Sequence, residues 1–130
     1  MTRRPRTPHR LLVVDDEPHI VRILVTLARE RGYDAAGAME LDEVLRHVRV
    51  TPPDVVLLDL NMPLVDGREL LARITEMDDS PAVIIMSGFV DELTAEVCRR
   101  YGAADVVRKP LQIDDLFRRV DAAARVVAAR

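Results

Sequence analysis

Five short apolar runs alternate along the chain with longer segments in which apolar residues recur at helical spacing. The runs cover residues 11–14, 34–38, 55–58, 82–86 and 105–108, of which the second is the weakest, and the helical segments begin near residues 18, 41, 67, 91 and 113. Strict alternation favours a parallel sheet, because the connection between two parallel strands carries a helix across one face. We therefore predict one doubly wound α/β domain with helices on both faces.

Residues that start and stop helices stand where this pattern needs them. Pro18 suits the first helical turn, where no backbone donor is required, and Gly32 suits the end of the first helix. The sequence Thr51-Pro52-Pro53 is expected to end the second helix. The expected boundaries thus rest on local chemistry as well as on periodicity.

Composition excludes several classes of function. The formal net charge is -3 and the pI is about 5.6, so no basic field is available for direct binding to nucleic acid. The apolar runs are far shorter than the ~20 residues of a membrane span. One cysteine, Cys98, allows no internal disulfide. We expect a cytoplasmic protein without a membrane anchor, and we interpret Arg118 and Arg119 as a solvated helix face.

The first ten residues differ in composition from the rest. They hold four arginines and two prolines with almost no apolar residue. Such a segment buries too little apolar surface to fold. The apolar run that follows stops at Asp15, too early for a secretory signal. We predict a disordered basic N-terminal extension over residues 1–10 and a folded domain over residues 11–128.

Polar residues follow four of the apolar runs directly. Asp15 and Asp16 follow the first run, Asp59 the third, Ser87 the fourth and Lys109 the fifth. In an open parallel sheet the carboxyl ends of the strands meet at one edge, where ligands bind. The sequence therefore predicts a site at this edge with three carboxylates, a hydroxyl and an ammonium group.

Carboxylates held close together repel unless a cation neutralises them. Mg²⁺ prefers a few carboxylate oxygens completed by water and phosphate oxygens, so Asp16 and Asp59, with Asp15 nearby, suit it better than Ca²⁺. Alternatively, Asp15-Asp16-Glu17 caps the first helix, where negative charge is favourable. Helix capping does not explain why Asp59 ends a separate apolar strand at the same edge.

Asp59 can also act as a nucleophile, because a carboxylate beside a metal ion can attack phosphorus and form an aspartyl phosphate. Lys109 is the only lysine among 19 basic residues. Its compact ammonium fits against phosphoryl oxygens in a tight site better than a planar guanidinium does. Ser87 can donate a hydrogen bond to another phosphoryl oxygen.

With these residues the chain resembles the receiver domains of bacterial two-component response regulators. The resemblance covers about residues 11 to 127 and rests on four motifs: Asp15-Asp16, Asp59-Leu60-Asn61-Met62-Pro63 followed by Asp66-Gly67, Ser87-Gly88, and Lys109-Pro110. It implies a flavodoxin-like (βα)5 fold with strand order 2-1-3-4-5. It also implies a signalling switch that catalyses only its own phosphorylation and dephosphorylation, with Asn61 and Phe89 tuning those rates.

The resemblance assigns a role to each site residue. Asp59 is the phosphoacceptor. Mg²⁺ is held by the side chains of Asp16 and Asp59, by the backbone carbonyl of Asn61, and by Asp15 through water. The Ser87 hydroxyl moves onto the phosphoryl group, and the Lys109 ammonium pairs with the same group. The Lys109-Pro110 bond is expected to be cis.

The resemblance also implies partners. The donor is a sensor histidine kinase or histidine phosphotransferase. The switch then acts on a downstream protein target, on an output domain in a longer parent chain, or by forming a homodimer.

Two positions depart from the family pattern. Val106 stands where an aromatic residue is usual in the fifth strand, and Leu111 replaces a common phenylalanine after Pro110. The usual rotation of a switch aromatic therefore has no counterpart here. Transmission through Ser87 and the backbone around Phe89 and Asp91 is one alternative, and a receiver that serves only as a phosphorylation-independent docking domain is another.

Two other classes fit less well. Phosphatases of the haloacid dehalogenase superfamily place a second aspartate two residues after the nucleophile, where this chain has Asn61, and they need a cap. A flavodoxin-like FMN protein needs a phosphate-binding first loop, whereas Asp15-Asp16-Glu17 repels phosphate. An aromatic content of 3% also offers little to stack on a flavin.

Overall fold

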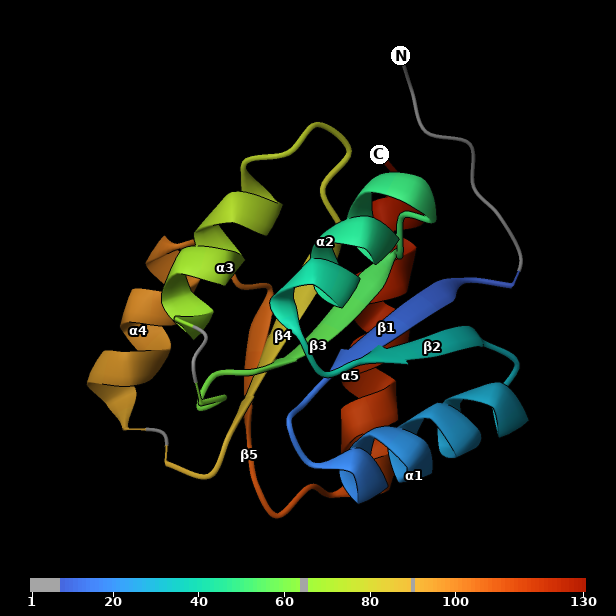
Figure 1. The fold of residues 1–130 in the computed structure, drawn as a ribbon, viewed down its shortest axis with the longest axis horizontal. Helices are drawn as coiled ribbons and strands as arrows, with labels where there is room; N and C mark the ends of the chain where they lie inside the picture. Colours follow the sequence, from blue (N-terminus) through green and yellow to red (C-terminus); the bar gives the residue numbers. More distant parts are fainter. Residues whose placement is uncertain (1–7, 64–65, 90) are drawn as a thin grey trace.

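The computed structural model describes residues 8–63, 66–89 and 91–130 (Figure 1). None of the helices among these residues is both long and apolar enough to cross a membrane. Strands and helices alternate as the sequence predicts: β1 Arg10–Val14, α1 Pro18–Glu30, β2 Asp34–Ala38, α2 Leu41–Val50, β3 Val55–Asp59, α3 Gly67–Thr75, β4 Ala82–Ser87, α4 Glu92–Arg100, β5 Asp105–Arg108 and α5 Ile113–Ala128.

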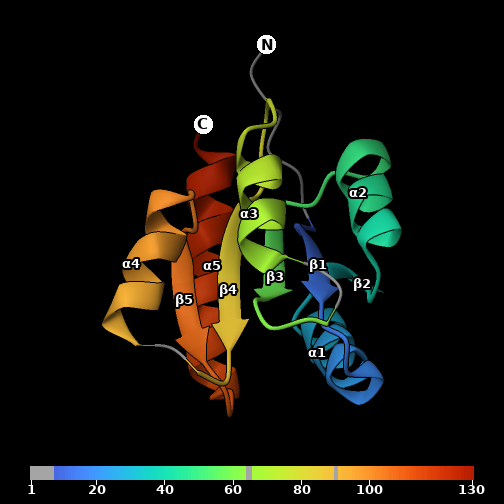
Figure 2. The ribbon, with the colours of Figure 1, turned by 60° about the vertical axis from the view of Figure 1, so that its left-hand side comes forward.

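The strands form one parallel sheet in the order β2-β1-β3-β4-β5. Figure 2 shows β1, β3 and β4 side by side and pointing the same way. The predicted doubly wound fold and its strand order are therefore confirmed. All carboxyl ends of the strands lie along one edge of the sheet, which is where the polar residues were expected to meet.

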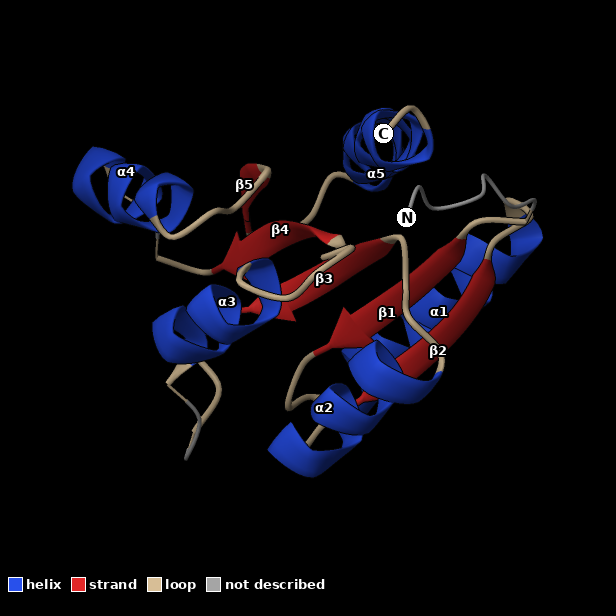
Figure 3. Cartoon of the chain, turned by 90° about the horizontal axis from the view of Figure 1, so that it is seen from above, coloured by secondary structure: helices blue, strands red, loops and turns tan. Residues whose placement is uncertain are grey.

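Alternate residues of the central strands pack on opposite faces of the sheet. Leu11, Val13 and Leu57 belong to a buried cluster completed by α1 and α5, whereas Leu12 and Leu58 belong to a second cluster completed by α2, α3 and α4. Figure 3 shows α5 and α3 on opposite sides of the sheet. Burial on both faces explains why β3 and β4 are apolar runs and not alternating patterns.

Local contacts fix the start of α3, beside the carboxyl edge of the sheet, and the end of α1, at the amino edge. The Asp66 carboxylate accepts hydrogen bonds from the backbone N–H groups of Arg68 and Glu69 at 3.1 and 3.3 Å, which fixes the start of α3. A Cβ at Gly67 would lie 2.7 Å from the Leu60 carbonyl oxygen, so the loop after β3 can fold back only with glycine there. At the end of α1, Gly32 has φ +92°, as expected of a helix stop.

Some boundaries differ by one residue from the sequence prediction. β1 begins at Arg10, because the Arg10 N–H donates to the Asp54 carboxylate at 2.7 Å and its carbonyl accepts from the Asp54 N–H at 2.8 Å. The end of the predicted disordered extension is therefore structured, while residues 1–7 of that extension lie outside the described part of the chain. β3 and β4 extend to Asp59 and Ser87, and α4 begins at Glu92, one residue later than predicted.

Candidate functional site at the carboxyl edge of the sheet

Three charged residues from three different strands or strand ends meet at the carboxyl edge. Asp15 follows β1, Asp59 ends β3 and Lys109 follows β5. The Lys109 Nζ lies 2.8 Å from Asp15 Oδ2 and 3.7 Å from Asp59 Oδ2. Asp15 is fully buried and Asp59 is 4% exposed. The structure therefore brings together two predicted carboxylates and the single lysine, with Asp15 as the closer partner of the ammonium group.

Backbone contacts hold these residues in register. Asp59 lies opposite Met86 in β4, and Ser87 lies opposite Arg108 in β5. The Lys109 N–H donates to the Ser87 carbonyl at 2.8 Å, and the Lys109–Pro110 peptide bond is cis, as the resemblance implies. The site is thus built on the ends of four neighbouring strands, β1, β3, β4 and β5, and on the loops that follow them.

The charges of the site are only partly balanced. Burial raises the pKa of Asp59 above that of an ordinary aspartate, Asp15 and Asp16 raise it further, and the Asn61 N–H and the Lys109 charge oppose the shift. Burial would lower the pKa of Lys109, but the hydrogen bond to Asp15 and the charges of Asp15 and Asp59 raise it overall. The Lys109 ammonium is therefore protonated at neutral pH, and ionisation of Asp59 is less favourable than that of an exposed aspartate.

Asp16 and Glu17 extend the acidic group toward solvent. Carboxylate oxygens of Asp15, Asp16 and Glu17 lie within 4.8 Å of one another, with Asp15 buried and the other two exposed. Glu17 is the N-cap residue of α1, but its side chain makes no capping bond, and the Asp15 carboxylate accepts the Glu17 N–H at 3.0 Å. The capping alternative therefore does not account for this cluster, and Glu17 joins the group as an acid that the predicted ligand set left out.

The donor set of this edge fits a hard divalent cation. Carboxylate oxygens from Asp15, Asp16 and Asp59 face one ammonium group, so the site carries more negative than positive charge. Asp15 and Asp59 are buried and Asp16 is exposed, so water, which Mg²⁺ keeps among its ligands, can reach this edge beside Asp16. The composition of the site therefore fits Mg²⁺, with Asp15, Asp16 and Asp59 as candidate side-chain ligands.

Ser87 links the loops that follow β3 and β4. Its Oγ lies 2.5 Å from Asn61 Oδ1 and 3.1 Å from the Phe89 carbonyl oxygen, and it accepts the Phe89 N–H at 3.2 Å. The Asn61 N–H donates to Asp59 Oδ1 at 3.1 Å. Asn61 therefore contacts both the predicted phosphoacceptor and the predicted hydroxyl. Sequence reasoning assigned Asn61 a role through its carbonyl and missed the side-chain contact.

The positions that depart from the family pattern lie beside the site. Val106 is half-buried against the cluster that includes Leu58 and Ile85. Leu111 lines an apolar hollow of about 500 Å³, together with Ile20, Ile23, Leu24, Lys109, Pro110 and Ile113. Phe89 is 80% exposed, so an aromatic ring at this edge faces solvent.

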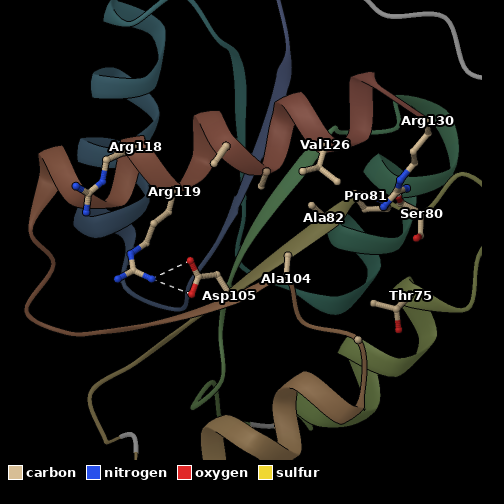
Figure 4. A pocket seen from close by; sticks show the side chains of 13 residues that line it. Thr75, Ser80, Pro81, Ala82, Ala104, Asp105, Arg118, Arg119, Val126 and Arg130 are labelled. Carbon is tan, nitrogen blue, oxygen red and sulfur yellow. Dashed lines mark hydrogen bonds and ion pairs between the residues drawn. The ribbon is translucent and has the colours of Figure 1, made fainter.

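A second hollow, of about 780 Å³, lies at the opposite end of the sheet between α5 and the starts of β4 and β5 (Figure 4). On its wall the Arg119 guanidinium holds Asp105 at 2.8 and 2.9 Å and Asp115 at 2.9 Å. Arg118 contacts Asp115 and remains 77% exposed. Arg118 therefore lies on a solvated face, as predicted, whereas Arg119 is only partly solvated, because its guanidinium pairs with Asp105 at the start of β5.

A family model described as the response regulator receiver domain matches residues 11–121. The chain belongs to this family. The receiver domain is 34% identical over 111 residues to the transcriptional regulatory protein BaeR of Escherichia coli O6:H1, covering 85% of this chain and 46% of that protein. It is 36% identical over 115 residues to the transcriptional regulatory protein KdpE of Mycobacterium tuberculosis, covering 88% and 50%.

Solved structures agree with this assignment. The receiver domain of the Francisella response regulator 1452 superposes with a TM-score of 0.83 at 29% identity, covering 90% of this chain and 97% of that one. A response regulator from Thermotoga maritima shares the fold with a TM-score of 0.82 at 23% identity, covering 90% and 98%. The receiver domain described here spans about half the length of BaeR and KdpE.

Proposed function

We propose that this receiver domain is a phosphorylation switch in which Asp59 accepts a phosphoryl group in a Mg²⁺-dependent reaction. The observation that carries the proposal is the position of Asp59, a buried carboxylate at the end of β3, with the Lys109 ammonium 3.7 Å away and two further aspartates nearby. Membership of the receiver family supports the same reading. The domain is not a metabolic enzyme, and it catalyses only its own modification.

In the proposed reaction an Asp59 carboxylate oxygen attacks the phosphorus of a phosphohistidine. The new O–P bond forms as the N–P bond breaks, and the electron pair leaves with the imidazole of the donor. Asp15 holds the Lys109 ammonium at 2.8 Å, within reach of Asp59, so a positive charge is in place for the phosphoryl oxygens. Ser87, the last residue of β4, is the proposed donor of a further hydrogen bond to them once its hydroxyl moves.

Asp15, Asp16 and Asp59 are the residues that would hold Mg²⁺, with the Asn61 carbonyl as the proposed fourth protein ligand. When bound, the cation would neutralise the carboxylates and draw charge from the phosphoryl oxygens. Removal of that repulsion would also favour the ionised, nucleophilic form of Asp59, whose pKa is otherwise raised.

The proposed donor is a sensor histidine kinase or histidine phosphotransferase in the cytoplasm. The buried free thiol of Cys98 is compatible with a reducing compartment. Relatives such as BaeR and KdpE carry the name transcriptional regulatory protein and are about twice as long as the matched region. We propose that the switch acts on a downstream protein or on a linked output domain, or changes self-association.

The test is intact-mass spectrometry of the chain after incubation with acetyl phosphate, with and without Mg²⁺. We expect the mass of one phosphoryl group to be added only with Mg²⁺, and the addition to vanish in Asp59→Asn. The matched control is Asp66→Asn, because asparagine also caps helices and Asp66 lies in the same loop outside the site.

A gain that persists in Asp59→Asn would place the modification elsewhere and overturn the assignment. No gain from acetyl phosphate, followed by none from a panel of phosphorylated histidine kinases, would favour the docking-only alternative.

A further inference from the structure

The Ser87 hydroxyl is already committed in the structure. A serine hydroxyl has one proton to donate, and the Ser87 Oγ lies 2.5 Å from Asn61 Oδ1, closer than the 3.1 Å to the Phe89 carbonyl oxygen. The same oxygen accepts the Phe89 N–H at 3.2 Å. Ser87 can therefore donate to a new acceptor only if it gives up Asn61.

We propose that the Asn61 side chain is a positioning residue that restrains the Ser87 hydroxyl and opposes its transfer to the phosphoryl group on Asp59. The inference rests on the proposed function and adds a residue that acts through Ser87. The Asn61–Ser87 hydrogen bond stabilises the unphosphorylated state and is absent once Ser87 donates to phosphoryl oxygen. Its strength therefore sets part of the equilibrium between the two states.

The surroundings of the two residues make this exchange feasible. Asn61 is exposed, so water can replace Ser87 at its amide oxygen, whereas Ser87 is fully buried and, besides Asn61, contacts the Phe89 carbonyl oxygen. The backbone N–H of Asn61 holds Asp59 separately from the side chain. Truncation of the Asn61 side chain thus removes the restraint while it leaves the contact with the phosphoacceptor intact.

The restraint also reaches the loop after β4. Because the Phe89 N–H bonds to the Ser87 oxygen, movement of the hydroxyl loosens or re-forms the contact that holds Phe89. The Phe89 ring is 80% exposed, and α4 begins three residues later, capped by Asp91 through the Thr94 N–H at 2.7 Å. The path from Ser87 to Phe89 can therefore transmit the phosphorylation state of Asp59 although position 106 holds valine and not an aromatic residue.

The experiment is a double-mutant cycle with beryllofluoride and Mg²⁺ as the phosphoryl mimic, in which ¹⁹F NMR measures the apparent dissociation constant. Asn61→Ala in the wild-type chain is expected to tighten binding roughly two- to tenfold, the worth of one hydrogen bond. In the Ser87→Ala background the same change is expected to have no effect. Gln112→Ala is the matched control, because this exposed amide begins α5 without a side-chain capping bond.

Equal tightening in both backgrounds would show that Asn61 acts without Ser87 and would overturn the proposal, as would weaker or unchanged binding in Asn61→Ala alone. If the wild-type chain binds the mimic but the cycle shows no coupling, only the restraint is wrong. If a folded wild-type chain does not bind the mimic with Mg²⁺, the restraint and the proposed switch both fail.

Discussion

Two clusters of acidic and basic side chains lie at opposite ends of β5, and they differ in charge balance. At the carboxyl edge Lys109 faces Asp15 and Asp59, with Asp16 nearby, and the pKa of Asp59 is raised. Near the start of β5, Arg118 and Arg119 face Asp105 and Asp115, and these contacts lower the pKa of Asp115 and raise that of Arg119.

The comparison separates two uses of the same residue types. Matched charges satisfy one another and contribute modestly to stability at a partly exposed surface. An excess of buried carboxylate is unfavourable by itself, and a site that must bind a cation and receive a phosphoryl group needs that excess. In the Arg119 cluster the pKa of the acid is lowered and that of the base is raised, which indicates a structural role. In the Asp59 cluster the pKa of the acid is raised, which indicates a chemical role.

The largest expected effect comes from the lone cation of the unbalanced cluster. Lys109→Met should slow phosphoryl uptake from acetyl phosphate on the order of 10²-fold, because a positive charge positioned for the developing charge is lost. Lys109→Arg keeps a charge opposite the buried Asp15, yet it should also be slow, because a guanidinium is broader than an ammonium. Initial rates from intact-mass time courses measure both changes.

Arg118→Met is the control from the balanced cluster and should leave the uptake rate unchanged. Circular dichroism establishes that each variant is folded, which matters for Lys109→Met because it leaves Asp15 without its partner. Uptake by a folded Lys109→Arg at the wild-type rate would show that the ammonium shape is irrelevant.

The second prediction concerns stability. Asp59→Asn should raise the free energy of unfolding at neutral pH by about 0.5–2 kcal/mol, because it removes a buried charge that nothing fully balances. Asp105→Asn should do the opposite, since it breaks the contacts of Arg119. Chemical denaturation of the metal-free chain at pH 7 compares the two variants with the wild type.

The pH dependence of this difference follows from the raised pKa of Asp59. In the unfolded chain the group loses its proton near pH 3.8, and in the folded chain it does so at higher pH. Between those values the folded state binds more protons, so the stability of the wild type falls as the pH rises through the window. The gain in free energy of unfolding from Asp59→Asn should therefore be full at neutral pH and vanish as the pH falls toward 3.8. A gain that stays constant with pH would contradict this prediction.

The sequence was sufficient for the fold and for the edge of the sheet at which the predicted site residues lie. Alternation of elements is a chain-wide signal, and a residue at the end of a buried parallel strand can lie only at the carboxyl edge, so Asp59, Ser87 and Lys109 were placed correctly. Contacts between side chains from different loops were not available in this way. The Asn61–Ser87 bond and the pairing of Arg119 with Asp105 depend on side-chain direction and on register between segments far apart in the chain.

The smallest expected effect belongs to the balanced cluster. Arg119→Met should lower the free energy of unfolding by only about 0.5–1 kcal/mol, because its side chain is 37% exposed and water screens the attraction to Asp105 and Asp115. The loss should shrink in high salt, where such pairs are screened further. Arg118→Met should change stability still less, because the Arg118 side chain is 77% exposed. Denaturation could instead show that Arg119→Met lowers the free energy of unfolding by more than Asp59→Asn raises it. The cluster near the start of β5 would then be a main support of the fold. The division between a structural cluster and a chemical one would need a different physical basis.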